Sequence, residues 1–127
     1  MNVPRTIGAA ALLACLAFAG TAQAHPKLLS TNPVANSAVA KPTKIALKFS
    51  ETLIAPMSAA DVIMTKMPGT AAKPMKIAGI TSALAADRKT LVLSARQPLT
   101  TGTYRVNWHV VSADTHRIQG SFTFAVR

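Results

Sequence analysis

Acidic residues are scarce in this chain of 127 residues. Four carboxylate side chains (Glu51, Asp61, Asp87 and Asp114) face 14 lysines and arginines. So few carboxylates leave an enzyme of the acid/base type little to work with. The chain also lacks a glycine-rich phosphate loop and an elbow-like setting for a nucleophilic serine. The sequence therefore does not indicate a hydrolase.

Cysteine is almost absent too. The single cysteine, Cys15, lies in an N-terminal stretch that has the three parts of a secretory signal. Arg5 supplies the positive start, residues 7–20 are an apolar run, and Ala22 and Ala24 are the small residues before a cleavage site. The run is too short to span a bilayer, which takes about 20 apolar residues.

Cleavage after Ala24 would leave residues 25–127 as one compact exported domain. We predict this processing, with residues 1–24 as the signal peptide. A membrane anchor and a lipoprotein cut before Cys15 are the alternatives. The exported domain would contain no cysteine, so its metal ligands would have to be histidine, carboxylate, methionine or the terminal amine.

The formal net charge of +10 favours anionic partners. Nucleic acid is the usual expectation for a basic chain. However, a secreted protein meets little nucleic acid, and the positive residues here are scattered and form no dense run. We therefore predict no nucleic-acid partner and interpret these residues as solvated positions with weak attraction to membrane lipid.

Alternating apolar and polar residues predict β-strands separated by turn residues. The three clearest strands are 44–50, 104–110 and 121–126; shorter candidates are 28–29 at an edge, 62–64 and 91–93. No segment after residue 24 has a helical period longer than a turn or two. The pattern predicts an all-β sandwich or small Greek-key barrel, with Trp108 in the core and His109 pointing outward.

His25 directly follows the predicted cleavage site, so it would carry a free amine beside its imidazole. Asp114 and His116 are two residues apart, which in an extended segment puts both side chains on one side with Cα atoms ~6.6 Å apart. A turn in which Asp114 bonds its own backbone and His116 is exposed is the equal alternative. His25 would favour a metal site if the fold brought the chain start to this loop.

Such a group would contain an amine, two imidazoles and one carboxylate. This nitrogen-rich set suits Cu(II) in tetragonal geometry, and Zn(II) in a tetrahedron is the rival. A terminal amine has an ordinary pKa of about 7.7 to 8.0, so the affinity for metal should fall as the solution is acidified.

Met57, Met64, Met67 and Met75 form a second cluster in the sequence. Thioethers can hold Cu(I), but methionine also fills irregular gaps in cores and loops. Met64 and Met67 would face opposite ways in a regular strand, so a shared site would require a bend near Pro68.

Several segments together resemble the CopC family of periplasmic copper-binding proteins. They are 25–28 (HPKL), 45–51 (IALKFSE), 64–69 (MTKMPG), 99–108 (LTTGTYRVNW) and 111–124 (VSADTHRIQGSFTF). The resemblance covers essentially all of residues 25–127. It implies a Greek-key β-barrel or sandwich of about seven strands, cupredoxin-like or immunoglobulin-like in shape.

The resemblance also implies the ligands. Cu(II) would be held by the amine and imidazole of His25 with Asp114 and His116, and Glu51 would be a weak ligand or a group behind the ligands. A loop with Met64, Met67 and Met75 would hold Cu(I). Here the match is incomplete, because Thr70 and Ala72 stand where founding members of the family have a methionine and a histidine.

We therefore expect a periplasmic copper carrier that is not an enzyme and acts in copper homeostasis or resistance. The resemblance implies transfer to an inner-membrane copper transporter of the CopD kind, by a monomer or weak dimer. One alternative is a copper-dependent oxidase with the same histidine bracket, although the chain leaves little room for a substrate platform. Another is a structural β-domain that binds no metal.

Overall fold

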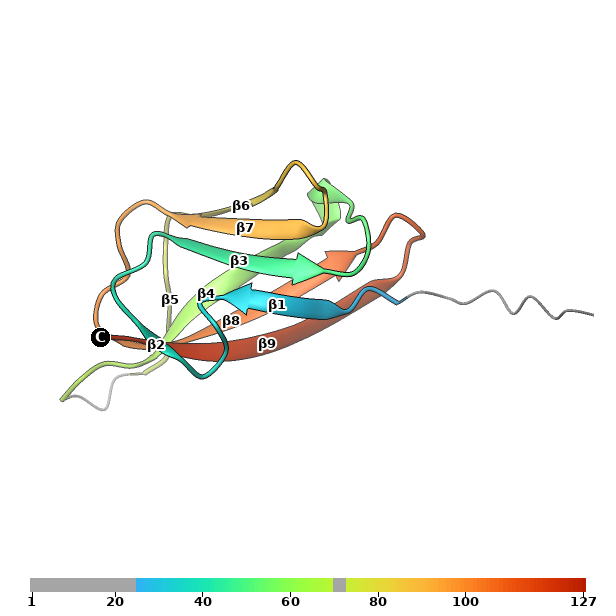
Figure 1. The fold of residues 1–127 in the computed structure, drawn as a ribbon. Helices are drawn as coiled ribbons and strands as arrows, with labels where there is room; N and C mark the ends of the chain where they lie inside the picture. Colours follow the sequence, from blue (N-terminus) through green and yellow to red (C-terminus); the bar gives the residue numbers. More distant parts are fainter. Residues whose placement is uncertain (1–24, 70–72) are drawn as a thin grey trace, which may run out of the picture.

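Residues 25–69 and 73–127 are described by a computed structural model, and they form nine strands and one short 3-10 helix (Figure 1). The elements are β1 (Leu28–Asn32), β2 (Ala38–Val39), β3 (Lys44–Phe49), η1 (Ala55–Met57), β4 (Ala59–Lys66), β5 (Met75–Lys76), β6 (Ile80–Leu84), β7 (Thr90–Ala95), β8 (Gly102–Val111) and β9 (Arg117–Val126). Within these two ranges, no helix is long and apolar enough to cross a membrane.

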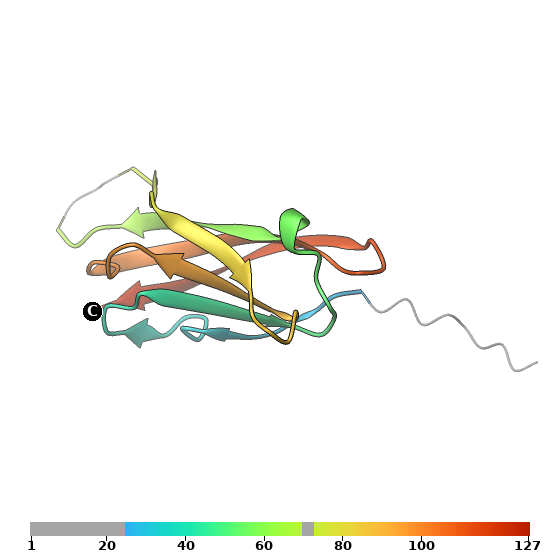
Figure 2. The same ribbon diagram turned by 90° about the horizontal axis from the view of Figure 1, so that it is seen from above.

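The strands form two sheets that face each other as layers (Figure 2). One sheet has the order β1-β3-β7-β6 and the other the order β2-β9-β8-β4-β5. All neighbours are antiparallel except β2 and β9, which run parallel. The all-β class and the sandwich are confirmed. The sheets do not close into the barrel that was the other expected form.

Alternation of apolar and polar residues accounts for the long strands. In β3, Ile45, Leu47 and Phe49 are buried, whereas Lys44 and Lys48 are exposed. β8 and the second half of β9 show the same alternation, so the three clearest predicted strands are confirmed. The shorter candidates correspond to parts of β4, β7 and β1, and β1 lies at a sheet edge as expected.

Three strands have no signal in the sequence pattern. β2 and β5 contain two residues each, which is too few for alternation. β6 is an edge strand whose central residues Thr81, Ser82 and Ala83 are all exposed. These strands bring the number to nine in the described residues, against the expected seven or so.

The core lies between the sheets and includes Trp108, as predicted. Trp108 is 8% exposed, and its ring meets Phe49 edge-on with centroids 5.1 Å apart. Gly120 lies opposite Trp108 in the β8–β9 ladder, and a Cβ atom added at Gly120 would lie 2.5 Å from Cζ2 of the indole. The indole thus fills the space that a side chain at position 120 would need. His109, the next residue of β8, is exposed as expected.

The two ends of the sandwich carry different segments. Residue 25, where the described part of the chain begins, and the turn between β8 and β9 lie at one end, whereas the C-terminus and the end of β4 lie at the other (Figures 1 and 2). The predicted Cu(II) ligands and the predicted Cu(I) loop are therefore far apart.

Candidate metal centre

The segment after β3 ties the chain start to the β8–β9 turn. The Lys27 N–H donates to Ser50 Oγ at 2.9 Å, and the Ser50 N–H donates to the Lys27 carbonyl at 2.9 Å. Two residues further on, the Thr52 carbonyl accepts a hydrogen bond of 2.8 Å from the Ala113 N–H. Through these contacts the fold holds His25 beside a turn that is distant from it in the sequence.

The imidazoles of His25 and His116 are in contact. Their ring centroids are 4.7 Å apart, and the ring planes make an angle of 72°. Rings this close can each turn a nitrogen toward one ion. The fold thus brings the chain start to the loop that carries Asp114 and His116, as the prediction of a metal site required.

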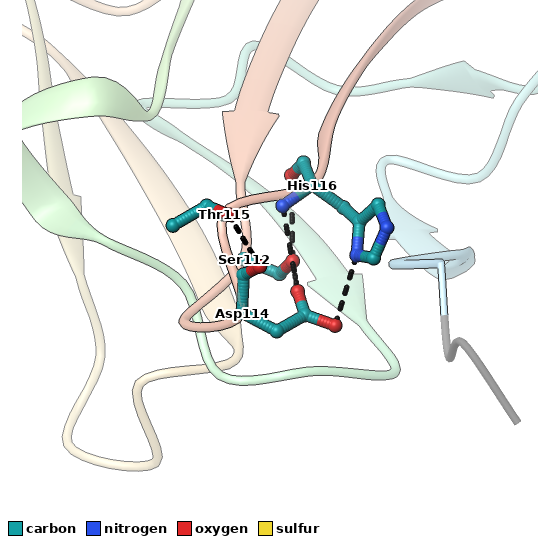
Figure 3. Close-up of polar contacts among 4 residues, drawn as sticks. All are labelled: Ser112, Asp114, Thr115 and His116. Carbon is teal, nitrogen blue, oxygen red and sulfur yellow. Dashed lines mark hydrogen bonds and ion pairs between the residues drawn. The ribbon is translucent and has the colours of Figure 1, made fainter. Parts of the chain in front are cut away.

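Residues 112–116 form a turn that is closed by its own hydrogen bonds (Figure 3). The Ser112 N–H donates to the His116 carbonyl at 2.9 Å, and the Thr115 N–H donates to the Ser112 carbonyl at 2.8 Å. Thr115 has a φ of 72°, in the left-handed region that β-branched residues rarely adopt. Asp114 therefore lies in a turn and not in the extended segment that was the other expected conformation.

Within this turn the Asp114 side chain still reaches His116. The Ser112 hydroxyl donates to Asp114 Oδ1, and Asp114 Oδ2 lies 2.9 Å from His116 Nδ1 (Figure 3). Oδ2 and Nδ1 are in close contact but are not aligned as a hydrogen bond, so the buried Nδ1 has no hydrogen-bond partner among the described residues. A buried nitrogen of this kind beside a carboxylate oxygen fits a pair of metal ligands.

Ser112 also changes the acidity of its partner. Its hydrogen bond, followed by the contact with His116, lowers the pKa of the Asp114 carboxyl from 3.8 to about 2. Asp114 is therefore ionised at neutral pH and can accept a metal ion without releasing a proton. Ser112 was not among the residues predicted from the sequence, because its burial depends on the folded structure.

Glu51 lies on the connecting segment, next to Ser50, and is partly buried. Within the described ranges its carboxylate forms no ion pair with a histidine, and no three His, Cys, Asp or Glu side chains are gathered as a ready metal site. Before cleavage the backbone nitrogen of His25 is an amide joined to Ala24. The amine that the prediction requires therefore exists only after cleavage.

The methionines of the predicted Cu(I) loop lie on and after β4 and on β5. Met64 is buried in the core, whereas Met67 and Met75 are exposed. Met64 and Met75 are directly opposite in the β4–β5 ladder, so their side chains share one face of the sheet. A β-bulge between Met64 and Lys66 interrupts the alternation before the predicted bend at Pro68.

Thr70 and Ala72, where the chain departs from the family pattern, lie outside the described residues. Met57 does not join the other three methionines. It is exposed on η1, and η1 packs against β8 away from the β4–β5 connection (Figure 2).

The CopC domain profile matches residues 28–127. Copper resistance protein C of Pseudomonas syringae pv. tomato is 44% identical over 127 residues, which is 100% of both chains. PcoC, a methionine-rich copper resistance protein from Escherichia coli, is similar in structure with a TM-score of 0.75 and 49% identity, over 82% of this chain and 100% of PcoC. CopC from Methylosinus trichosporium OB3b has a TM-score of 0.65 at 26% identity, over 80% of this chain and 93% of its own. The chain belongs to the CopC family, and the resemblance of its sequence segments to that family is thereby confirmed.

Proposed function

We propose that the protein, once cleaved after Ala24, is a periplasmic carrier that binds Cu(II) through His25, Asp114 and His116. The observation that carries this proposal is the contact between the imidazoles of His25 and His116 beside the Asp114 carboxylate. Its relatives are named copper resistance proteins, which supports copper as the ion and resistance or homeostasis as the role.

The donor set explains the choice of Cu(II). Cleavage adds a terminal amine to the imidazole of His25, and the amine, two imidazoles and one carboxylate suit the tetragonal geometry of Cu(II) better than the tetrahedron of Zn(II). The amine has an ordinary pKa of about 7.7 to 8.0, so copper must displace its proton at neutral pH. Acid therefore weakens binding at the amine while Asp114 is still ionised, because the pKa of Asp114 is far below that of the amine.

Glu51 and the methionines complete the proposal. Glu51 acts as a weak ligand or as a residue that contacts a ligand but not the ion. Its segment forms hydrogen bonds with both the chain start and the β8–β9 turn. Met64, Met67 and Met75 form a separate Cu(I) site at the other end of the sandwich, with the adjacent pair Met64 and Met75 at its centre.

The site is open to a partner, since the side chain of Asp114 is 48% exposed and that of His116 is 29% exposed. We propose that copper passes from this end to an inner-membrane transporter of the CopD kind, and that the carrier works as a monomer or weak dimer. A carrier is favoured over a copper oxidase that acts on polysaccharide, because Tyr104 and Trp108 are buried and give no aromatic surface for a sugar.

The proposal is tested by comparing protein that begins at His25 with protein that retains Ala24. We expect the first to bind one equivalent of Cu(II) and the second to bind at least about 100-fold more weakly, which corresponds to ~2.7 kcal/mol, because its amine is blocked. Competition with a chelator gives the affinities, and the mass of the exported protein identifies its first residue.

His109→Ala is the matched control, since this histidine lies exposed on β8. It should leave Cu(II) binding unchanged. If the protein that begins at His25 and the protein that retains Ala24 bound Cu(II) with equal affinity, the amine would not be a ligand. Failure of the correctly processed protein to bind one equivalent would refute the proposed function.

A further inference from the structure

The β8–β9 turn contains a buried serine that faces a proposed ligand. Ser112 is 1% exposed, and the only other buried polar side chain among the described residues is that of Ser58, at 5%. A hydroxyl taken out of water costs free energy unless it finds a hydrogen-bond partner. The hydrogen-bond partners of the Ser112 hydroxyl therefore offset the cost of its burial and indicate its role.

All the polar groups of Ser112 are used within the turn. Its N–H donates to the His116 carbonyl and its carbonyl accepts from the Thr115 N–H. Its hydroxyl lies close to Asp114 Oδ1 and 3.3 Å from the His116 carbonyl oxygen. A hydroxyl has one proton, and the closer acceptor, which is also charged, is the Asp114 carboxylate.

This bond fixes the orientation of a side chain that is half-exposed and would otherwise move among rotamers. Asp114 Oδ1 accepts from the Ser112 hydroxyl and, at 3.4 Å, from the His116 N–H. The other oxygen, Oδ2, then lies beside His116 Nδ1 (Figure 3). One carboxylate oxygen is occupied by the protein, and the second is left for an ion.

We propose that Ser112 is the positioning residue of the metal centre: its buried hydroxyl holds Asp114 in the ligand orientation before the ion arrives. This inference rests on the proposed function, because Asp114 is a ligand only if the site binds copper. Ser112 itself does not touch the ion and acts through Asp114. Removal of a group that orients a metal ligand typically weakens metal binding about 10- to 100-fold.

The first test compares Ser112→Ala with Ser58→Ala in protein that begins at His25. Ser58 is similarly buried, and its Oγ accepts from the Val111 N–H at 3.2 Å; among the described residues it forms no hydrogen bond with Asp114 or His116. We expect S112A to bind Cu(II) about 10-fold more weakly and to change the Cu(II) EPR spectrum. S58A should lower stability and leave both properties unchanged.

Rescue separates a hydroxyl effect from a packing effect. Ser112→Thr keeps the hydroxyl, so we expect it to bind Cu(II) nearly as tightly as the wild type and more tightly than S112A. If S112A does not fold, Ser112→Val replaces it, because valine has the shape of threonine without the hydroxyl and cannot bind copper. Wild-type affinity and spectrum in S112A, or in S112V where that is used, would overturn the inference.

A double-mutant cycle tests whether Ser112 acts through Asp114. In protein that already carries Asp114→Ala, the further change Ser112→Ala should not reduce Cu(II) affinity any more, because the side chain that Ser112 orients is gone. An equal loss in both backgrounds would mean that Ser112 acts on the site by another route and would refute the positioning role.

The crystal structures of metal-free wild type and S112A, or S112V, make the outcome independent of copper. We expect Asp114 to leave His116 Nδ1 when the hydroxyl is removed, and an unmoved Asp114 would refute the inference. If the wild type binds no Cu(II), the proposed function fails. A displaced Asp114 would then still support Ser112 as the residue that orients it.

Discussion

Asp114 links the stability of the β8–β9 turn to pH. Its pKa is about 2 in the folded protein and 3.8 ordinarily. A carboxyl group whose pKa is lowered by folding stabilises the folded state above the ordinary value, and this contribution disappears as the pH falls to the folded value. We therefore expect the metal-free protein to lose stability between about pH 4 and pH 2, and Asp114→Asn to lose less over this interval.

Urea unfolding midpoints of wild type and D114N across this pH interval check the expectation. Asp87→Asn is a useful comparison, because the pKa of Asp87 is also lowered, chiefly by the Lys89 N–H and then by the Thr90 hydroxyl. Each variant should remove only its own share of the pH dependence. A D114N variant with the full acid sensitivity of the wild type would contradict the argument.

At the same scale, the sequence was sufficient to propose His25, Asp114 and His116 as candidate ligands, because their residue types and the predicted cleavage site are visible in it. It was not sufficient to identify Ser112. Nothing local distinguishes a buried serine from an exposed one, and the burial of Ser112 depends on packing at the end of the sandwich. The choice between a turn and an extended segment at Asp114 likewise depended on hydrogen bonds of the folded loop.

Among the strands, β9 has a position that tolerates no side chain. In Gly120→Ala the new Cβ would lie 2.5 Å from Cζ2 and 2.9 Å from Cε2 of the Trp108 indole. The indole packs against Phe49 and cannot yield freely, so we expect G120A to lower the free energy of unfolding by about 1–3 kcal/mol. Chemical denaturation monitored by circular dichroism measures this loss.

A smaller ring at position 108 provides the control. Trp108→Phe should be destabilising alone, but the double variant W108F/G120A should lose less than the sum of the two single losses, because the clash is relieved. Strict additivity would show that Gly120 is needed for a reason other than space for the indole.

Strand prediction succeeded where one face of a strand is buried. β3 and β8 alternate between core and surface along their whole length, and β9 does so in its second half, so period two was visible in the sequence. β5 and β6 were missed because β5 is a two-residue piece and β6 is exposed through its middle. Edge strands of this kind depend on pairing with a neighbour rather than on their own pattern.

The whole molecule keeps its two candidate copper sites at opposite ends (Figure 1). We therefore expect Met75→Ala to change Cu(II) affinity by less than about twofold, since distant sites without shared contacts behave independently. Chelator competition with Cu(II) checks this, and the same variant should weaken Cu(I) binding. A loss of Cu(II) affinity greater than about fivefold would show that the two ends are coupled.

The contact between His25 and His116 is also a property of the whole fold. It depends on the pairing of Lys27 with Ser50 and of Thr52 with Ala113, which join segments far apart in the sequence. No periodicity or motif reports such a pairing. The resemblance to a family was therefore needed to predict that the chain start meets the loop.

The pairing of Lys27 with Ser50 has a consequence for the order of maturation. Only His25 and Pro26 separate this pairing from the bond after Ala24, and Pro26 is fully buried. A peptidase needs an accessible, flexible stretch around the bond that it cuts, and a docked chain start does not provide one. If residues 1–24 are a leader as predicted, we therefore expect it to be removed before β1 settles against β3, so that the order of proteolysis and folding determines whether the proposed site forms.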